Sequence, residues 1–343
     1  MSTLELHANS GSTKVVFADS WEFLMSLKNG PRMTIVTDEN VMKTYNDKMD
    51  GFDTVVLEAG ENSKTLESAE RIYDKFLEYD VDRSSLIVGI GGGTVTDATG
   101  FVAATFMRGV PFGFVPTTLL AQVDASIGGK NGLNFRGFKN MIGTVKQPEF
   151  CVVDFSFLKT LPSDQMISGM AEVAKCGVIM NRRLFEHVER NHARIISLET
   201  QSLETAVSEA ISSKISVVEM DERDGGERMK LNFGHTVGHA IEKVMGLPHG
   251  KSVAIGMAAE SRLASYMGLL PITDVDRIER LLERLGLPTG CRANGSEVFE
   301  AIGKDKKSSG EFIRIALPET IGRGSIHKID KEELRYAVDE VCS

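Results

Sequence analysis

The chain has 343 residues, of which 42% are hydrophobic and 25% charged, and its formal net charge is −9 at pH 7. This length exceeds one ordinary hydrophobic core and predicts two domains, while the composition excludes an intrinsically disordered chain. The acidic balance argues against nucleic acid as a partner, and no apolar run reaches the roughly 18–20 residues that span a membrane.

The N-terminal segment and the cysteines predict a cytoplasmic protein. The segment MSTLELHANSGSTK lacks a basic stretch followed by an apolar core, so we expect no secretory signal. The cysteines show no CxxC spacing, which is typical of reduced thiols and not of a disulfide framework or a thiolate metal site. They are Cys151, Cys176, Cys291 and Cys342.

The first half of the chain alternates predicted strands with helical patterns. Short β-branched runs predict strands at 14–17, 33–36, 53–58 and 85–90. Apolar residues recur at three- and four-residue spacing from Leu66 to Leu77, which indicates one face of a helix. The alternation predicts an α/β domain over residues 1–158 with a parallel, Rossmann-like sheet, and ligands near the carboxyl ends of its strands.

The pattern changes after a last predicted strand at 151–155. Residues 163–285 are almost entirely helical in pattern, and 311–318 with 324–329 predict a late pair of strands. We therefore expect a mainly α-helical domain over residues 159–343.

The stretch VGIGGGTVTD (88–97) follows an apolar strand and opens a helical pattern. Consecutive glycines let a backbone approach a pyrophosphate, and a helix start offers N–H groups to it. The stretch fits neither G-x-G-x-x-G nor a P-loop, so a tight strand–helix turn remains the alternative to a nucleotide site. Nearby, Glu61 and Lys64 of AGENSKT (59–65) could contact a ribose and a phosphate, or form a solvated turn.

The interval from Ala98 to Lys146 is cationic although the chain is acidic. Its one acid is Asp124, and its basic residues are Arg108, Lys130, Arg136, Lys139 and Lys146. Residues 115–143 add hydroxyls, glycines and an amide, at Thr117, Thr118, Gly128, Gly129 and Asn140. These donors predict a small anionic ligand that carries phosphate and hydroxyl groups, and a solvated basic face is the alternative.

The segment SGMAEVAKCGVIM (168–180) predicts a helix with Glu172 and Lys175 one turn apart. Such a pair is normally a surface ion pair. Its small and apolar neighbours also allow a buried carboxylate, which would need a metal or the lysine as partner.

Three of the seven histidines lie close together, at His235, His239 and His249. A helix places the first two on one face, and the third follows a Leu247-Pro248 break. Histidines with a carboxylate suit zinc with an open coordination position, and histidines bonded to the backbone are the alternative. Helical geometry from about Asn232 would also bring Arg228 onto that face.

Together these motifs resemble those of the 3-dehydroquinate synthase family, over roughly residues 15–340. The resemblance rests on G-E-x-x-K (60–64), GGG…D (91–97), RGVPF…PTTLLAQVD (108–124), GGK (128–130), KNMIG (139–143), SGMAEV-x-K (168–175), R-x-x-LNFGHT-x-GHAIE (228–242) and HG…VAIGM (249–257). It implies a dehydroquinate synthase-like fold and a lyase that closes a carbocycle from a sugar-acid phosphate in the shikimate pathway of aromatic amino-acid biosynthesis. NAD would be oxidised only transiently, between phosphate elimination and an intramolecular aldol closure.

The resemblance also implies roles for individual residues. Zinc or cobalt would be held by Glu172, His235 and His249, while His239 would face the substrate. Substrate-contacting or catalytic residues would be Arg108, Asp124, Lys130, Asn140, Lys175, Lys214, Arg228, Asn232, His239 and a lysine of 305–307, taken as Lys306. NAD contacts would be Asp38, Glu61, Lys64, Gly91, Gly92, Gly93, Asp97, Thr117, Thr118, Lys130, Lys139, Phe157, Thr160, Leu161 and Gln165. The family's counterpart of Arg108 reaches the neighbouring subunit's site, so a homodimer is implied.

Some positions depart from the family pattern, namely Thr96, Asn131, Phe138, Lys251 and the stretch TVKQP (144–148). The alternatives are another sugar phosphate cyclase, similar to 2-deoxy-scyllo-inosose synthase, and a metal-dependent polyol dehydrogenase, which would produce NADH. A non-catalytic binding protein of the same fold is a third alternative.

Overall fold

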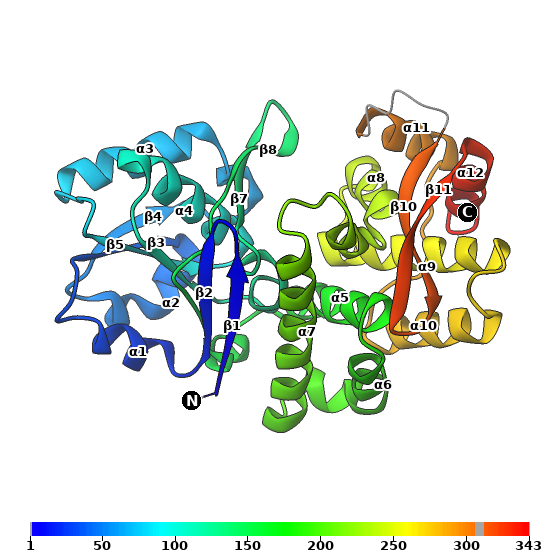
Figure 1. Cartoon of the computed structure of the whole chain (residues 1–343), viewed down its shortest axis with the longest axis horizontal. Coiled ribbons are helices and arrows are strands. Elements are labelled where there is room, and N and C mark those ends of the chain that lie inside the picture. The colour runs from blue at the N-terminus through cyan, green and yellow to red at the C-terminus, as the bar shows by residue number, and fades with distance from the viewer. Residues whose placement is uncertain (1, 306–311, 343) are drawn as a thin grey trace. The chain divides into compact units, whose positions relative to one another are not determined.

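The computed structural model describes residues 2–305 and 312–342. It divides into two compact units (Figure 1). The first contains residues 1–161 with 214–222, and the second contains residues 162–213 with 223–343. The first unit contains the α/β elements and the second is mainly helical, with the last part of one helix assigned to the first unit.

A seven-stranded sheet organises the first unit, in the order β1-β2-β9-β6-β5-β3-β4. The strands are β1 Ser2–Ala8, β2 Gly11–Phe17, β3 Met33–Asp38, β4 Asp53–Leu57, β5 Leu86–Gly91, β6 Phe112–Pro116 and β9 Phe150–Val153. All pairings are parallel except β1 with β2. The predicted parallel sheet is confirmed, and the antiparallel edge strand β1 adds to it.

Helices connect these strands and cover the sheet. They are α1 Ser20–Ser26, α2 Glu39–Met49, α3 Leu66–Glu78 and α4 Gly93–Thr105. Every residue of β5 is buried, as expected for a central parallel strand covered on both faces. Its Val88 and Ile90 pack with Ile35, Val115 and Val152 in one apolar core. The core fixes where each strand ends, and the polar residues discussed below follow those ends.

The segment between β6 and β9 is structured. A π-helical turn at Ala121–Ala125 leads into an antiparallel hairpin of β7 Lys130–Phe135 and β8 Phe138–Val145. In Figure 1 this hairpin projects beyond the seven-stranded sheet. Short 3-10 turns complete the unit at Glu61–Ser63, Phe106–Arg108 and Phe155–Lys159.

Helices make up most of the second unit. They are α5 Ser163–Ile179, α6 Arg182–Ile196, α7 Thr200–Met220, α8 His235–Met245, α9 His249–Tyr266, α10 Ile272–Arg284, α11 Gly295–Asp305 and α12 Lys331–Asp339. A 3-10 helix at Glu227–Asn232 precedes α8, and α7 continues into the first unit from Lys214. The predicted late strands form an antiparallel hairpin, β10 Ile313–Thr320 with β11 Arg323–Ile329. Within residues 2–305 and 312–342, no helix is long and apolar enough to cross a membrane.

Candidate active site

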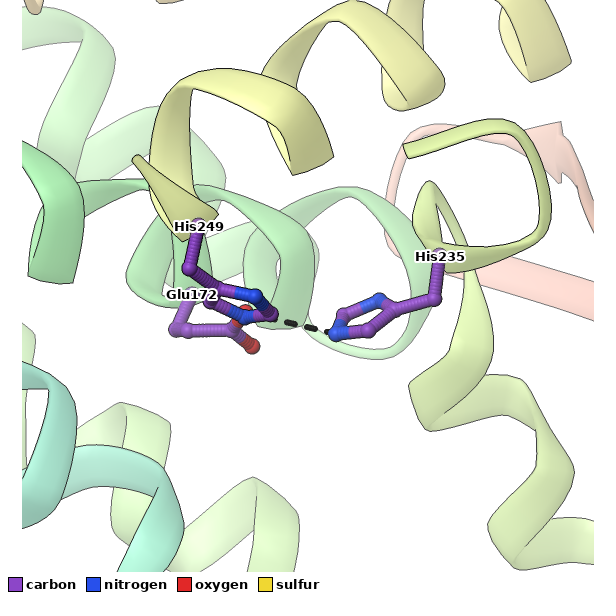
Figure 2. Close-up of side chains that lie close together, drawn as sticks. All are labelled: Glu172, His235 and His249. Atoms are coloured by element: carbon purple, nitrogen blue, oxygen red, sulfur yellow. Dashed lines mark hydrogen bonds and ion pairs between the residues drawn. The ribbon is translucent and has the colours of Figure 1, made fainter. Parts of the chain in front are cut away.

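Three side chains from three helices of the second unit converge on one point (Figure 2). Glu172 lies within α5, His235 is the first residue of α8, and His249 is the first residue of α9. One ligand atom from each lies within 4.8 Å of the others. Glu172 Oε1 is 3.3 Å from His249 Nε2 and 3.6 Å from His235 Nε2. This cluster of two imidazoles and a carboxylate has the donor set that zinc and cobalt prefer.

The second nitrogen of each imidazole has its own acceptor. His235 Nδ1 is 3.1 Å from the Phe233 carbonyl, and His249 Nδ1 is 3.3 Å from Glu242 Oε2. A carbonyl oxygen can only accept, so His235 Nδ1 donates, and its Nε2 carries the lone pair that faces Glu172. Partners of this kind fix the tautomer and orientation of metal-bound imidazoles. The residues present therefore fit a divalent metal ion.

A cation on the other side of Glu172 completes the cluster. Lys175 forms an ion pair with Glu172 Oε2, and the two side chains are only 2% and 1% exposed. The buried reading of this pair is therefore the correct one. Burial disfavours the charged form of Glu172, but Lys175 and the two imidazoles hold its pKa well below its usual range.

The two imidazoles differ in charge preference. Burial and the Lys175 ammonium lower the pKa of His235 to about 3, so this ring is neutral at pH 7. Burial also opposes a charge on His249, but its hydrogen bonds to Glu172 and Glu242 raise its pKa to about 9. One proton therefore occupies the position between His249 and Glu172 that a divalent cation would take over.

His239 lies outside this triad. Its ring is 5.0 Å from that of His235 and 6.0 Å from that of His249, and the side chain is exposed. It forms a second, more exposed group with Glu242 and His249, whose potential ligand atoms also lie within 4.8 Å of one another.

The expected single helical face from Arg228 to His239 is wrong. Arg228 and Asn232 belong to a separate 3-10 helix that ends at Asn232, and Gly234 precedes α8 with φ 78°, so the helix is interrupted between Arg228 and His239. A Cβ at residue 234 would lie 2.5 Å from Met257 Cγ, so only glycine allows both this turn and the packing behind it. Arg228 is nonetheless a buried cation, 3% exposed, a few residues before His235.

In the first unit, a second polar cluster lies where β4 and β5 end. Gly92 caps α4 without a side chain, so the helix start follows the strand directly. Lys64 forms an ion pair with Asp97 and donates to Asn140. Burial raises the pKa of Asp97 to about 6, although Lys64 opposes the shift. A helix N-terminus beside a carboxylate and an ammonium can contact both a pyrophosphate and sugar hydroxyls.

The remaining polar residues of this edge lie on nearby turns. Glu61 accepts hydrogen bonds from Thr94 at 3.2 Å and from Asn134 at 2.7 Å. Asp38 caps α2 through the N–H groups of Asn40 and Val41.

Another ion pair of the first unit joins Lys214 and Asp124. Lys214 donates to the carbonyl oxygen of Asp124 at 2.6 Å and also pairs with its carboxylate. Lys214 thus belongs to the first unit with Asp124, although it lies in a helix that begins in the second.

Comparison with known proteins decides the family. Residues 54–168 match the description "3-dehydroquinate synthase N-terminal", and residues 169–308 match "3-dehydroquinate synthase C-terminal". Relatives named 3-dehydroquinate synthase include one from Desulforamulus reducens, 44% identical over 316 residues, covering 88% of each chain. Another, from Acetivibrio thermocellus, is 40% identical over 323 residues, covering 91% of this chain and 90% of the relative.

The chain belongs to the 3-dehydroquinate synthase family.

Solved structures agree with this family fold. A 2-epi-5-epi-valiolone synthase from Streptomyces hygroscopicus, solved with NAD+ and Zn2+ bound, has a TM-score of 0.88 at 25% identity and covers 98% of both chains. A 2-deoxy-scyllo-inosose synthase, solved with carbaglucose-6-phosphate, NAD+ and Co2+, has a TM-score of 0.88 at 24% identity. It covers 99% of this chain and 100% of its own.

The family resemblance assigned other residues whose positions are now visible. Lys130 and Lys139 are exposed on the β7–β8 hairpin, and Thr117 and Thr118 follow β6. Thr160 lies 2.7 Å from the Tyr45 hydroxyl, whereas the Phe157 side chain belongs to the apolar core. Leu161 ends the first unit and Gln165 lies in α5 of the second.

Two further residues expected in the site are Arg108 and Lys306, and the structure describes only the first. Arg108 is exposed, in a turn where Met107 and Arg108 both have positive φ. Lys306 lies outside the described residues.

Sequence reasoning missed the groups that orient the imidazoles. Glu242 is the last residue of the quoted GHAIE motif, yet no role was inferred for it. Its position seven residues after His235 and seven before His249 was the available signal. The Phe233 carbonyl left no signal, because a backbone acceptor is identified only by its position in the fold.

Proposed function

We propose that this chain is a 3-dehydroquinate synthase that converts 3-deoxy-D-arabino-heptulosonate 7-phosphate into 3-dehydroquinate and phosphate, using NAD and one divalent metal ion. The observation that carries the proposal is the buried cluster of Glu172, His235 and His249, with an acceptor behind each imidazole. Relatives with the same name, at 40–44% identity over most of the chain, support it.

Glu172, His235 and His249 would hold zinc or cobalt. The metal would supply a Lewis acid that acidifies a substrate hydroxyl and stabilises the resulting alkoxide. Lys175 keeps Glu172 ionised, so the carboxylate remains a ligand at neutral pH. His239, whose imidazole is exposed one turn beyond His235, would exchange hydrogen bonds with the substrate.

NAD would bind at the strand ends of the first unit and would supply a hydride acceptor that returns the hydride later in the same turnover. The start of α4 at Gly92 and Gly93 offers N–H groups to the pyrophosphate. Asp97, with a pKa of about 6, and Glu61 offer acceptors for ribose hydroxyls.

A buried arginine and two exposed lysines suit the substrate's two anionic groups. Arg228, only 3% exposed, can bind a carboxylate through two parallel hydrogen bonds. Lys130 and Lys139 are exposed lysines that suit the phosphate until it leaves. Asp124 and Lys214 form a charge pair that can hold or deliver a proton between them.

The deciding experiment incubates the purified protein with NAD, zinc and the heptulosonate phosphate, and measures released phosphate, carbocyclic product and NADH. We expect equal amounts of phosphate and 3-dehydroquinate, with no accumulation of NADH. Steady NADH production matched to substrate loss would indicate a polyol dehydrogenase. Faster turnover of glucose 6-phosphate would indicate a cyclase of the inosose type.

The carboxylate of the substrate provides a sharper test through Arg228. Glucose 6-phosphate has no carboxylate, so its binding would lack the bidentate contact that Arg228 would make with the heptulosonate phosphate. We expect glucose 6-phosphate to lose about 2–4 kcal/mol of transition-state stabilisation relative to the heptulosonate phosphate, or roughly 30- to 1000-fold in kcat/KM. Arg228→Lys should narrow this preference while the bound metal stays at one per chain. An unchanged preference for the heptulosonate phosphate over glucose 6-phosphate would show that Arg228 does not bind the carboxylate.

We also propose that the enzyme is a homodimer in which Arg108 completes the partner's site. The exposed side chain in a turn with two consecutive positive φ values supports this role, because such backbone strain often marks functional positions. Arg108→Ala and Glu172→Gln should each be inactive alone, and hybrids of the two should regain activity. Hybrid dimers without activity would show that Arg108 acts in the site of its own subunit and not in the partner's.

A further inference from the structure

The helix that begins with His235 lacks the usual cap at its N-terminus. The residue before it is Gly234, which has no side chain to accept a hydrogen bond from the first turn. Unsatisfied N–H groups at a buried helix start are costly, so another acceptor is required.

A carboxylate from the next helix supplies that acceptor. Glu260 of α9 is fully buried, and its Oε2 lies 2.6 Å from the backbone nitrogen of Gly234. Its Oε1 lies 3.1 Å from the nitrogen of Thr236 and 3.3 Å from that of Val237. Both oxygens of one buried carboxylate thus accept N–H groups that flank His235, at the helix end where a negative charge is most favourable.

Glycines bring the two helices into backbone contact beside this cap. A Cβ on Gly256 of α9 would lie 1.9 Å from the Gly234 carbonyl oxygen, and one on Gly238 of α8 would lie 2.8 Å from the Ser252 carbonyl oxygen. The approach leaves little freedom for the start of α8 to move along α9.

The same helix α9 carries His249 at its first position. His249 and Glu260 are eleven residues apart, close to three full turns, so they lie on one face about 16 Å apart along the axis. The start of α9 therefore presents one imidazole, and a position about three turns further along α9 fixes the helix that presents the second imidazole.

We propose that Glu260 is a positioning residue for the metal centre: it fixes His235 relative to His249 and so sets metal affinity. This inference rests on the proposed metal site. Outer partners of metal ligands typically contribute roughly 10–100-fold in affinity, and Glu260 acts through the backbone on both sides of a ligand.

The test compares two helix caps in the same unit. Glu260→Gln keeps the shape but turns one acceptor oxygen into an NH2 donor that faces N–H groups. Asp330→Asn makes the same change from carboxylate to amide at α12, where a single oxygen, Asp330 Oδ1, accepts from Glu332 N at 2.8 Å and Glu333 N at 2.9 Å. Helix α12 carries none of Glu172, His235 and His249.

Zinc affinity is measured by competition with a chromophoric chelator, and the visible spectrum of the Co2+ form reports ligand geometry. We expect Glu260→Gln to bind zinc at least tenfold more weakly and to alter the Co2+ spectrum, with Asp330→Asn within twofold of wild type. Amide exchange at Thr236 and Val237 in the metal-free protein should quicken in Glu260→Gln only.

Wild-type zinc affinity and spectrum in folded Glu260→Gln, or equal losses in both variants, would overturn the proposal. If Glu260→Gln does not fold, Glu260→Asp, which keeps the charge but shortens its reach, replaces it, and unchanged affinity there overturns the proposal equally. A wild-type protein that binds no zinc would instead overturn the metal site itself.

Discussion

The cluster of Glu172, His235 and His249 and the polar cluster at the ends of β4 and β5 each contain a lysine–carboxylate pair, and the pKa values of the two carboxylates shift in opposite directions. Glu172 faces Lys175 and two imidazoles, and its pKa stays well below the usual range. Asp97 faces one cation, Lys64, and burial raises its pKa to about 6. The groups around a buried carboxylate therefore decide the direction in which its pKa moves: Lys175 and the two imidazoles outweigh burial at Glu172, whereas Glu61 and Asp124 add to the effect of burial at Asp97. Glu172 is suited to a metal, whereas Asp97 is suited to hydrogen bonding with a neutral hydroxyl.

The largest effect should come from removing the more deeply buried carboxylate. Glu172→Gln leaves Lys175 buried without its anion, which should lower the free energy of unfolding of the metal-free protein by about 3–5 kcal/mol. Urea denaturation measures the loss. As a control, Glu186→Gln removes an exposed carboxylate that bonds Arg182 within one helix, and should leave stability unchanged. Equal stability of the two variants would show that the Glu172–Lys175 pair is not desolvated.

A smaller effect should follow from removing the carboxylate behind His249. Glu242→Gln weakens the hydrogen bond to Nδ1, so zinc affinity should fall roughly 10–100-fold without loss of fold. Chelator competition gives the value. Glu279→Gln, which breaks the Arg262 pair at 2.6 Å elsewhere in the unit, is the matched control and should retain wild-type affinity. If both bind zinc as the wild type does, Glu242 does not support the metal site.

The smallest effect concerns the pH dependence of stability. Because the folded-state pKa of Asp97 is raised to about 6, its contribution to stability is present below pH ~4 and is lost as the pH rises to about 6. The Asp97→Asn variant has no carboxyl to titrate here, so its free energy of unfolding should not fall in this way. The difference in free energy of unfolding, variant minus wild type, should therefore increase by about 1–2 kcal/mol between pH 4 and pH 7. Denaturation of the NAD-free proteins across this range measures the difference. A constant difference would mean that Asp97 titrates normally.

Much of the first unit could be predicted from the sequence, because periodicity reports burial directly. The β-branched runs at 33–36 and 85–90 became β3 and β5, and the apolar face from Leu66 to Leu77 became α3. The hairpin β7–β8 was not predicted, because its glycines and charged residues are also typical of a ligand-binding loop.

The cluster of Glu172, His235 and His249 could be predicted from the sequence only in part. Spacing indicated a metal near His235, His239 and His249 but could not select among them, since the choice depends on how α8 and α9 start. The turn at Gly234 interrupts the continuous helix expected from Asn232, because the positive φ of this glycine is not helical and a side chain at this position would clash with Met257. Glu260 acts across helices through backbone N–H groups, so no local pattern identifies it, whereas the only signal for Glu242 was its seven-residue spacing from His235 and from His249.

The most direct test of the account is the metal content of single histidine variants, measured by elemental analysis after dialysis against low zinc. The matched set is His235→Ala, His249→Ala and His239→Ala, which remove imidazoles from one neighbourhood with rings 5.0–6.0 Å apart. We predict one zinc per chain in the wild type and in His239→Ala, and far less than one in His235→Ala and His249→Ala. Loss of zinc from His239→Ala together with retention in His249→Ala would contradict the assignment of the ligands.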